Sequence, residues 1–250
     1  MSTPPRISVV VPFFNRQDHI GACIESLLGQ DDIGGPVEII LVDNRSSDAS
    51  VSIAKQYPAI VLLSEATAGA YAARNTGIRR AAAPLVAFTD ADCVVARDWL
   101  ASIWEGMRDP AVAMTIGACD YPAGASAALR LLGVYENAKA DYVASRCPPA
   151  YHFAYANNMA VRASAFQEVG LFREWARAAD TELVHRLAAA RPDLRLTFNP
   201  SMRVTHLEFL RLRDRLRRLS LYTTTNAKIP TFRELDVAQR TAVLLHMLKG

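Results

Sequence analysis

The segment "LVAFTDADCVV", residues 85–95, gives the strongest indication of the fold and of a site. An apolar run ends in two carboxylates one residue apart, Asp90 and Asp92, and the chain then becomes apolar again. Such acids repel each other, and they lose hydration if they are buried. A divalent cation bound by both would offset the repulsion and could hold a diphosphate. The alternative interpretation is an exposed turn after a strand, where aspartate is common.

Apolar runs and helical patterns alternate on both sides of this segment. Strands are predicted at 7–14, 37–43, 59–64 and 84–90, and helices after Asp18, near Ser47 or Asp48, and over 70–82. This alternation, which continues to about residue 109, is typical of βαβ units and a mainly parallel sheet. Ligands of such sheets lie beyond the carboxyl ends of the strands, where the sequence places Asn15, Asp43 and Asp90.

The pattern is less regular after residue 110. Strands are predicted at 112–117, 154–162, 194–199 and 202–206, and helices at 124–146 and 178–191. At about residue 207 the composition becomes basic and amphipathic. We therefore expect an α/β domain over 1–206 and a basic amphipathic helical C-terminal extension over 207–250.

Composition excludes several classes of protein. The net charge of the 250 residues is only +3, which gives no reason to expect nucleic-acid binding. No apolar run reaches about 18 residues, so no transmembrane helix is predicted, and the N-terminus lacks the features of a signal peptide. The four cysteines are scattered without a CxxC pair, which indicates reduced thiols in a cytoplasmic protein and no zinc site.

Four segments together resemble the family 2 glycosyltransferases of the GT-A fold, over roughly residues 6–206. They are "VVVPFFNR", "VEIILVDNRSSDAS", "GAYAARNTGIRRAAAPLVAFTDAD" and "AADTELVHRL". The resemblance implies an α/β, Rossmann-like, mixed but mainly parallel sheet flanked by helices. It also implies transfer of a sugar, with inversion, from a nucleotide-diphospho-sugar such as a UDP-sugar to an acceptor hydroxyl, with Mn2+ or Mg2+ as cofactor.

The resemblance also assigns donor-binding residues. It implies that Pro12, Phe13 and Asn15 line the nucleotide site and that Asp43 contacts the base or the ribose. It also implies that Arg74 and Asn75 lie near the base or the phosphate. Asp90 would contact ribose or metal-bound water, and Asp92 and His206 would bind the metal. The chemistry is compatible, since a carboxylate accepts hydrogen bonds from hydroxyls and ring N–H groups, and arginine is a fixed cation for phosphate.

Inverting transfer requires a base that takes the proton of the acceptor hydroxyl. The family usually places two acids at a helix start, and here Asp180 matches the second, while Ala179 replaces the first. We predict Asp180 as the base, with Glu182 as the fallback; capping of the helix is the alternative role for Asp180. Asn157 and Asn158 are predicted to bind donor sugar or acceptor. Trp175 is predicted to stack on a sugar, with core packing as the equal alternative.

The C-terminal segment and the acceptor allow several interpretations. Phe209, Leu212, Leu216 and Leu219 recur at helical spacing among arginines, which favours packing on the catalytic domain. Peripheral contact of 207–220 with an anionic membrane, at its cytoplasmic face, is the alternative. The predicted acceptor is a glycan, a lipid-linked molecule or a small molecule, as in the synthesis of cell-envelope polysaccharides. The Gln-x-x-Arg-Trp motif of processive synthases is absent from the sequence, so a single transfer is expected.

Two other functions remain open from the sequence. One is a nucleotide-sugar-binding protein without catalysis, which the loss of an acid at Ala179 allows. The other is a phosphatase in which Asp90 is the nucleophile and Asp92 a general acid, since "DADCV" fits that motif literally. The position disfavours the phosphatase, because its motif normally ends the first strand of the domain and three strand signals come earlier here.

Overall fold

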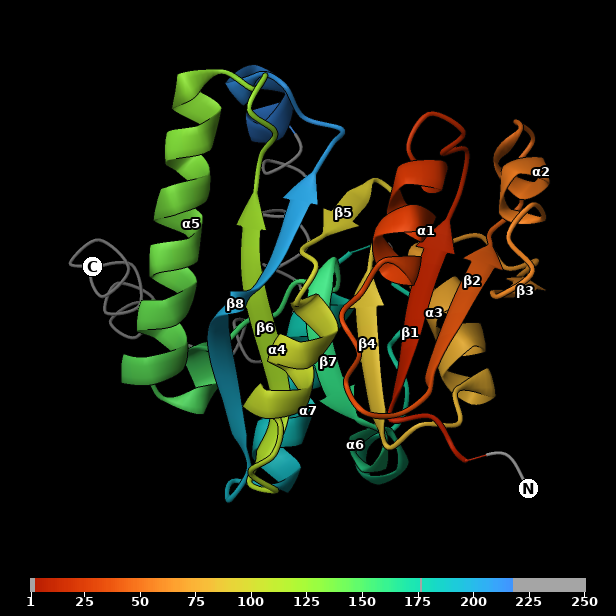
Figure 1. Cartoon of the computed structure of the whole chain (residues 1–250). Helices are drawn as coiled ribbons and strands as arrows, with labels where there is room; N and C mark the ends of the chain where they lie inside the picture. Colours follow the sequence, from red (N-terminus) through yellow and green to blue (C-terminus); the bar gives the residue numbers. More distant parts are fainter. Residues whose placement is uncertain (1–2, 176, 218–250) are drawn as a thin grey trace.

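The computed structural model describes residues 3–175 and 177–217. Within them, eight strands form one sheet in the order β3-β2-β1-β4-β7-β6-β8-β5, with helices on both faces (Figure 1). The strands are β1 (Ile7–Phe13), β2 (Val37–Asp43), β3 (Val61–Ser64), β4 (Leu85–Thr89), β5 (Cys93–Val95), β6 (Val112–Asp120), β7 (Asn158–Arg162) and β8 (Arg195–His206). The helices are α1 (Ile20–Leu28), α2 (Ser50–Ala54), α3 (Ala70–Arg80), α4 (Trp99–Gly106), α5 (Ala127–Arg146), α6 (Ala163–Val169) and α7 (Ala179–Ala190), with a short 3-10 helix η1 (Pro149–Tyr151).

The sheet is mixed and mainly parallel, as predicted. β1 pairs in parallel with β2 and β4, β2 pairs in parallel with β3, and β6 pairs in parallel with β8. β7 is antiparallel to β4 and β6, and β5 is antiparallel to β8. The chain leaves β1 toward β2 on one side and later returns to β4 on the other. This reversal opens a crevice beyond the carboxyl ends of β1 and β4, where ligands bind in such sheets.

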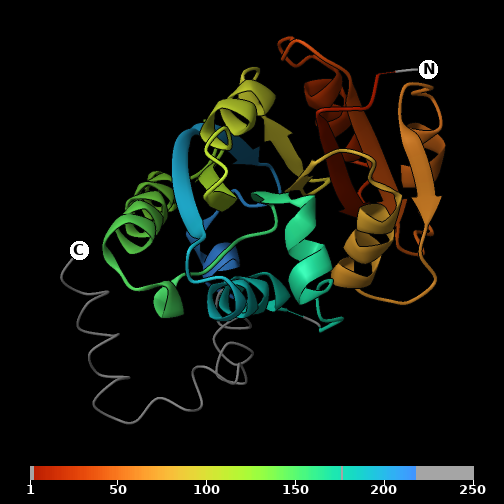
Figure 2. The same cartoon turned by 90° about the horizontal axis from the view of Figure 1, so that it is seen from below.

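Both faces of the sheet are covered, which explains why β1 is apolar at almost every position. Val9 and Val11 pack in one core cluster with side chains of α1 and α4, whereas Val10 packs in a second cluster with α3 and α7. Successive side chains of a strand point to opposite faces, so a strand buried on both sides has no polar alternation. Figure 2 shows α4 on one side of the sheet and α6 and α7 on the other.

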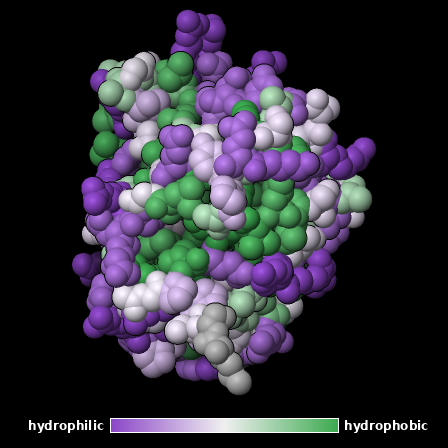
Figure 3. Space-filling model, turned by 45° about the vertical axis from the view of Figure 1, so that its right-hand side comes forward, coloured by the Kyte–Doolittle hydropathy of each residue, from purple (hydrophilic) through white to green (hydrophobic). Residues whose placement is uncertain are grey.

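A glycine allows α3 to lie close to β1. A Cβ atom at Gly77 would lie 2.4 Å from Cγ1 of Val10, closer than two carbon atoms can pack. On the surface, Figure 3 shows apolar side chains in the middle of one face of the molecule, with polar groups around them.

Local details differ from the sequence predictions. α1 begins at Ile20 after His19, so Asp18 is not its N-cap. Asp48 accepts hydrogen bonds from the backbone N–H groups of Gln17 and Ser50, and so joins the loop after β1 to the start of α2. The two strands predicted at 194–199 and 202–206 are one strand, β8, whose register with β6 shifts between Gly117 and Ala118.

Residues 207–217 pack against the sheet and α5. Phe209 is buried with Tyr121 and Leu129, and Ser126 donates its backbone N–H to the carbonyl of Leu210. Residues 212–217 are helical, and Leu216 is 49% exposed. The rest of the predicted extension, 218–250, lies outside the described residues. In the part of the chain that the structure describes, no helix is both long and apolar enough to span a bilayer.

Candidate active site

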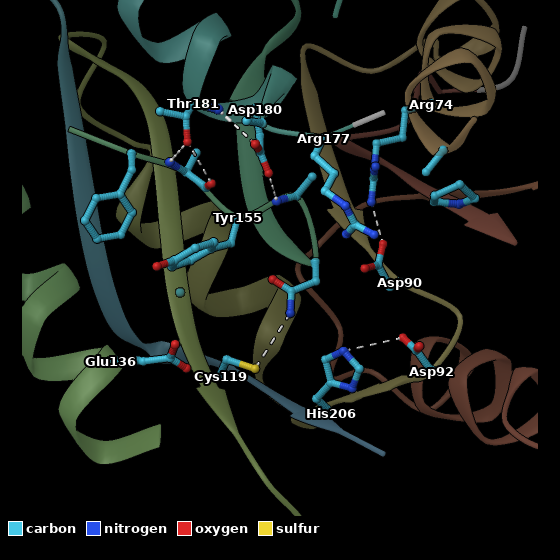
Figure 4. A pocket seen from close by; sticks show the side chains of 18 of the residues that line it. Arg74, Asp90, Asp92, Cys119, Glu136, Tyr155, Arg177, Asp180, Thr181 and His206 are labelled. Atoms are coloured by element: carbon cyan, nitrogen blue, oxygen red, sulfur yellow. Dashed lines mark hydrogen bonds and ion pairs between the residues drawn. The ribbon is translucent and has the colours of Figure 1, made fainter. Parts of the chain in front are cut away.

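A cavity of about 680 Å³ lies at the carboxyl ends of the parallel strands and continues toward α5. Figure 4 shows labelled side chains from several elements around it. The residues predicted from the sequence that line the cavity are Pro12, Phe13, Asn15, Arg74, Asp90, Asp92, Asn157, Asp180 and His206. The structure therefore brings together residues that are up to 194 positions apart, from Pro12 to His206.

Asp92 and His206 are neighbours because β5 pairs with β8. In that pairing Cys93 lies opposite His206, and Nε2 of His206 is 3.9 Å from Oδ1 of Asp92. Burial raises the pKa of Asp92, and the charge of Asp90 adds to this effect, while Arg16 opposes it. A carboxylate in this setting is stabilised by any cation that reaches it.

These two side chains fit a divalent cation such as Mn2+ or Mg2+. Ligand atoms of Asp92, Cys93 and His206 lie within 4.8 Å of one another. Carboxylate oxygen suits both ions and imidazole suits Mn2+, whereas a thiol is a soft ligand. Burial raises the pKa of Cys93 well above its ordinary value. Because Mn2+ and Mg2+ prefer oxygen and nitrogen to sulfur, Asp92 and His206 are better candidates than Cys93 for such an ion.

Arg74 and Asp90 form an ion pair beside this site. The Arg74 guanidinium is buried and lies 5.1 Å from the ring centroid of Tyr71. Burial alone would lower the pKa of Arg74, but Asp90 and the charges of Tyr71 and Asp180 raise it. Arg74 is therefore a permanent cation held at a fixed position in the cavity wall.

The sequence prediction did not select Arg16, although the residue ends the quoted segment "VVVPFFNR". Its Nε lies 3.3 Å from Oδ2 of Asp92, and its Nη2 lies 3.6 Å from Oε1 of Glu208. Arg16 lines the cavity at the end of the loop that follows β1. It is a second arginine within reach of an anion in this crevice.

Asp180 lies in the first turn of α7 and is buried. Its Oδ2 accepts the backbone N–H of Ala156 at 3.1 Å, and its Oδ1 accepts that of Thr181 at 2.9 Å. Burial raises its pKa, while these N–H bonds, Arg74 and Tyr71 oppose the rise. The residue before α7 is Ala178, with φ 65°, so Asp180 is not the N-cap itself. A fixed carboxylate with a raised pKa is well suited to accept a proton.

Four predicted residues do not line the cavity. Asp43 ends β2 and accepts the backbone N–H of Ser46 at 3.0 Å, while its neighbour Asn44 lines the cavity. Trp175 is partly buried in the loop before α7 and lies outside the lining. The other two, Asn75 and Asn158, have their side chains occupied by the protein itself.

Asn75 exchanges two hydrogen bonds with the backbone of Phe172, at 2.9 and 3.1 Å. It holds the loop that leads to α7. Asn158 accepts the indole N–H of Trp99 and donates to the carbonyls of Ala118 and Met202, each at 2.8 Å. It therefore joins β6 and β8 at their register shift, and it has a structural contact for each of its polar atoms instead of a substrate.

The part of the cavity toward α5 was not predicted from the sequence. Its lining includes Tyr121, Glu136, Asn137, Lys139, Tyr151, Phe153, Tyr155 and Arg215. Their only signal in the sequence is an excess of aromatic residues over 151–155.

Comparison with known proteins assigns the fold and the family. The profile described as Glycosyl transferase family 2 matches residues 8–170, more than half of the chain. The chain is 29% identical over 178 residues to glycosyltransferase AglE of Haloferax volcanii, which covers 68% of this chain and 57% of AglE. It is 27% identical over 223 residues to the pre-mycofactocin glycosyltransferase of Mycobacterium tuberculosis, which covers 86% of this chain and 46% of the relative. The chain thus spans about half the length of these relatives.

Two solved structures show the same fold. The mannosyltransferase PcManGT from Pyrobaculum calidifontis, in complex with GDP-Man and Mn2+, has a TM-score of 0.63 and 25% identity, covering 81% of this chain and 57% of that one. Residues 1–349 of S. aureus TarS, in complex with UDP-GlcNAc, have a TM-score of 0.63 and 17% identity, covering 97% of this chain and 71% of that one. The sheet order, the crevice and the family match agree: the chain has the GT-A fold and belongs to glycosyl transferase family 2.

Proposed function

We propose that this protein transfers a sugar from a nucleotide-diphospho-sugar, with a UDP-sugar as the expected donor, to an acceptor hydroxyl, with inversion and with Mn2+ or Mg2+. One observation carries the proposal: the Asp92–His206 pair, the Arg74–Asp90 pair and Asp180 all line one cavity. The GDP-Man and Mn2+ in the PcManGT complex support it by similarity.

The donor is proposed to lie in the crevice between β1 and β4. Asp92 and His206 would hold the cation, which when bound supplies Lewis-acid stabilisation of the leaving diphosphate. Arg74 is the fixed positive charge beside it, and Asp90 is available to ribose hydroxyls or to metal-bound water. The nucleoside would lie along Pro12, Phe13 and Asn15, where the ring of Phe14, 55% exposed, offers a surface for base stacking.

Asp180 is proposed as the general base. Two backbone N–H groups and the Tyr71 hydroxyl donate to its carboxylate, which has about four acceptor positions, so one position remains for the proton of the acceptor hydroxyl. Attack of the deprotonated hydroxyl on the anomeric carbon, opposite to the diphosphate, inverts that carbon. Ala179, where the family usually has another acid, is fully buried in the core, so Asp180 would act without a neighbouring carboxylate.

The acceptor is proposed to be a glycan, a lipid-linked molecule or a small molecule. Contact of 207–220 with an anionic membrane, at the cytoplasmic face, stays a prediction. Exposed Arg211 and Arg213 and exposed Leu210 favour it, whereas the burial of Phe209 against Tyr121 and Leu129 favours packing on the catalytic domain.

A panel of UDP-, GDP- and dTDP-sugars, with and without Mn2+, tests the function through thermal stability and donor turnover. Because a ligand that binds the native state stabilises it, the true donor raises the melting temperature only with the metal. Turnover by the wild type and its loss in Asp180→Asn support a transferase. Binding without turnover would identify a nucleotide-sugar-binding protein. Phosphate release from a phosphomonoester, lost in Asp90→Asn, would identify the phosphatase.

A further inference from the structure

The cavity has a second branch that the donor residues do not occupy. It lies between α5, β6 and the segment 151–157, and we call it the α5 branch. Its aromatic lining comprises Tyr121, Tyr151, Phe153 and Tyr155. Figure 4 shows Tyr155 and Glu136 on the opposite side of the view from Asp90 and Asp92. Aromatic side chains in a concave site favour ligands with a flat apolar face, such as a sugar or another ring.

The α5 branch begins at the proposed base. The backbone N–H of Ala156 donates to Asp180, and the backbone N–H of Ala154 lies 3.5 Å from the hydroxyl oxygen of Thr181, the next residue of α7. These contacts hold the segment that carries Phe153 and Tyr155 against the start of α7. A molecule in the branch therefore lies beside Asp180, whose position is fixed by the same contacts.

Glu136 and Lys139, two charged residues of the α5 branch, differ in their contacts with the rest of the described chain. Both carboxylate oxygens of Glu136 accept from Nη2 of Arg215, at 3.2 and 3.3 Å, and one also accepts the hydroxyl of Tyr121 at 3.4 Å. Within the described residues, the Lys139 amine forms no hydrogen bond and no ion pair. It lies 5.4 Å from the ring centroid of Phe153 and 6.0 Å from that of Tyr135. Burial lowers the pKa of Lys139, while Glu136 opposes this effect.

A partly buried ammonium group beside aromatic rings retains its capacity to bind an anion. The rings contribute a modest cation–π attraction, but they accept no strong hydrogen bond from the three N–H donors. Glu136, the carboxylate whose charge acts on Lys139, is already engaged by Arg215 and so does not neutralise Lys139 fully. An oxyanion of the ligand would both restore the lost solvation and accept these donors.

We propose that the α5 branch is the acceptor subsite and that Lys139 binds an oxyanion of the acceptor, a carboxylate or a phosphate. The inference rests on the proposed function, and it narrows the acceptor to an acidic sugar or a sugar phosphate, free or as part of a larger glycan. The acceptor ring lies along the aromatic wall, its acidic group faces Lys139, and its attacking hydroxyl faces Asp180.

Three matched glycosides test the inference: 4-nitrophenyl β-D-glucoside, its 6-phosphate, and 4-nitrophenyl β-D-glucuronide. Their dissociation constants are measured by calorimetry with the protein saturated with UDP and Mn2+. The wild type is expected to bind one acidic glycoside about tenfold more tightly than the neutral one, as a charged hydrogen bond provides. Which of the two binds tightly distinguishes phosphate from carboxylate.

The preference is expected to disappear in Lys139→Gln and in Lys139→Met, and to persist in Lys55→Gln, which removes an exposed lysine directly after α2. Equal affinity for the three glycosides, failure of all three to bind, or a preference that survives both Lys139 variants would overturn the inference. Binding of UDP, GDP and dTDP is measured on the same samples. Failure of the wild type to bind any of the three would refute the proposed function, whereas normal nucleotide binding without an acidic preference refutes the acceptor inference alone.

Discussion

Replacement of Asn158 by alanine separates a structural role from a substrate-binding one. The side chain is 1% exposed and makes three hydrogen bonds of 2.8 Å, to Trp99, Ala118 and Met202. If each bond contributes about 1 kcal/mol net, Asn158→Ala lowers the free energy of unfolding by about 3 kcal/mol. In a domain of this size that is a fall in melting temperature of about 6–12 °C.

The neighbouring residue provides a matched control. Asn157 lines the cavity, and its described side-chain hydrogen bond is a weak one to Sγ of Cys119 at 3.7 Å. Asn157→Ala is therefore expected to change stability by less than about 0.5 kcal/mol. Both variants are unfolded by heat and by urea without ligand, and UDP affinity is measured on the folded protein.

The two variants are expected to differ in stability, because only Asn158 has a structural role. Asn158→Ala loses stability and keeps the nucleotide affinity of the wild type at a temperature where it is folded. Equal stability of the two variants, or a loss of UDP affinity in folded Asn158→Ala with unchanged stability, would refute the structural role.

Three other predictions concern catalysis and packing. Asp180→Asn should keep donor affinity and lower turnover about 100-fold or more, and retained turnover would exclude Asp180 as the base. Burial raises the pKa of Asp180 above its ordinary 3.8, and the base acts only when it is ionised. The value of kcat/KM should therefore fall as pH decreases through that raised pKa. A pH profile whose acid limb lies at or below 3.8 would contradict this expectation. Gly77→Ala should lower the free energy of unfolding by about 1–3 kcal/mol, because the added methyl group meets Val10. Gly124→Ala is the control, since no atom lies within 4 Å of a Cβ at that position, and it should not lower the free energy of unfolding. Equal urea midpoints of the two variants would show that α3 can shift.

The central strands were predictable from the sequence because each is a long apolar run. β1, β2 and β4 are buried by helices on both faces, so their composition alone identifies them. β5 has only three residues and exists because it pairs with β8, a contact more than 100 positions away in the chain. The local sequence around β5 does not predict that pairing. The sequence analysis therefore had no physical reason to place His206 beside Asp92.

The two asparagines show a second limit. Asn157 and Asn158 precede and begin the same strand, and adjacent side chains there point to opposite sides. Asn157 reaches the cavity and Asn158 joins β6 and β8, and nothing in the local sequence distinguishes the two. Likewise, nothing in the sequence distinguishes Lys139 and Glu136 from other charged residues of a predicted helix. They become part of a cavity only because residues 151–157 and Arg215 lie against α5.

Binding of Mn2+ tests the central claim most directly. Free Mn2+ is titrated by electron paramagnetic resonance with the wild type, Asp92→Ala and Lys55→Gln, each with and without UDP. The account predicts about one bound ion per chain when UDP is present, in the wild type and Lys55→Gln, and loss of that ion in Asp92→Ala. Failure of the wild type to bind Mn2+ with UDP, or equal binding by Asp92→Ala, would contradict it.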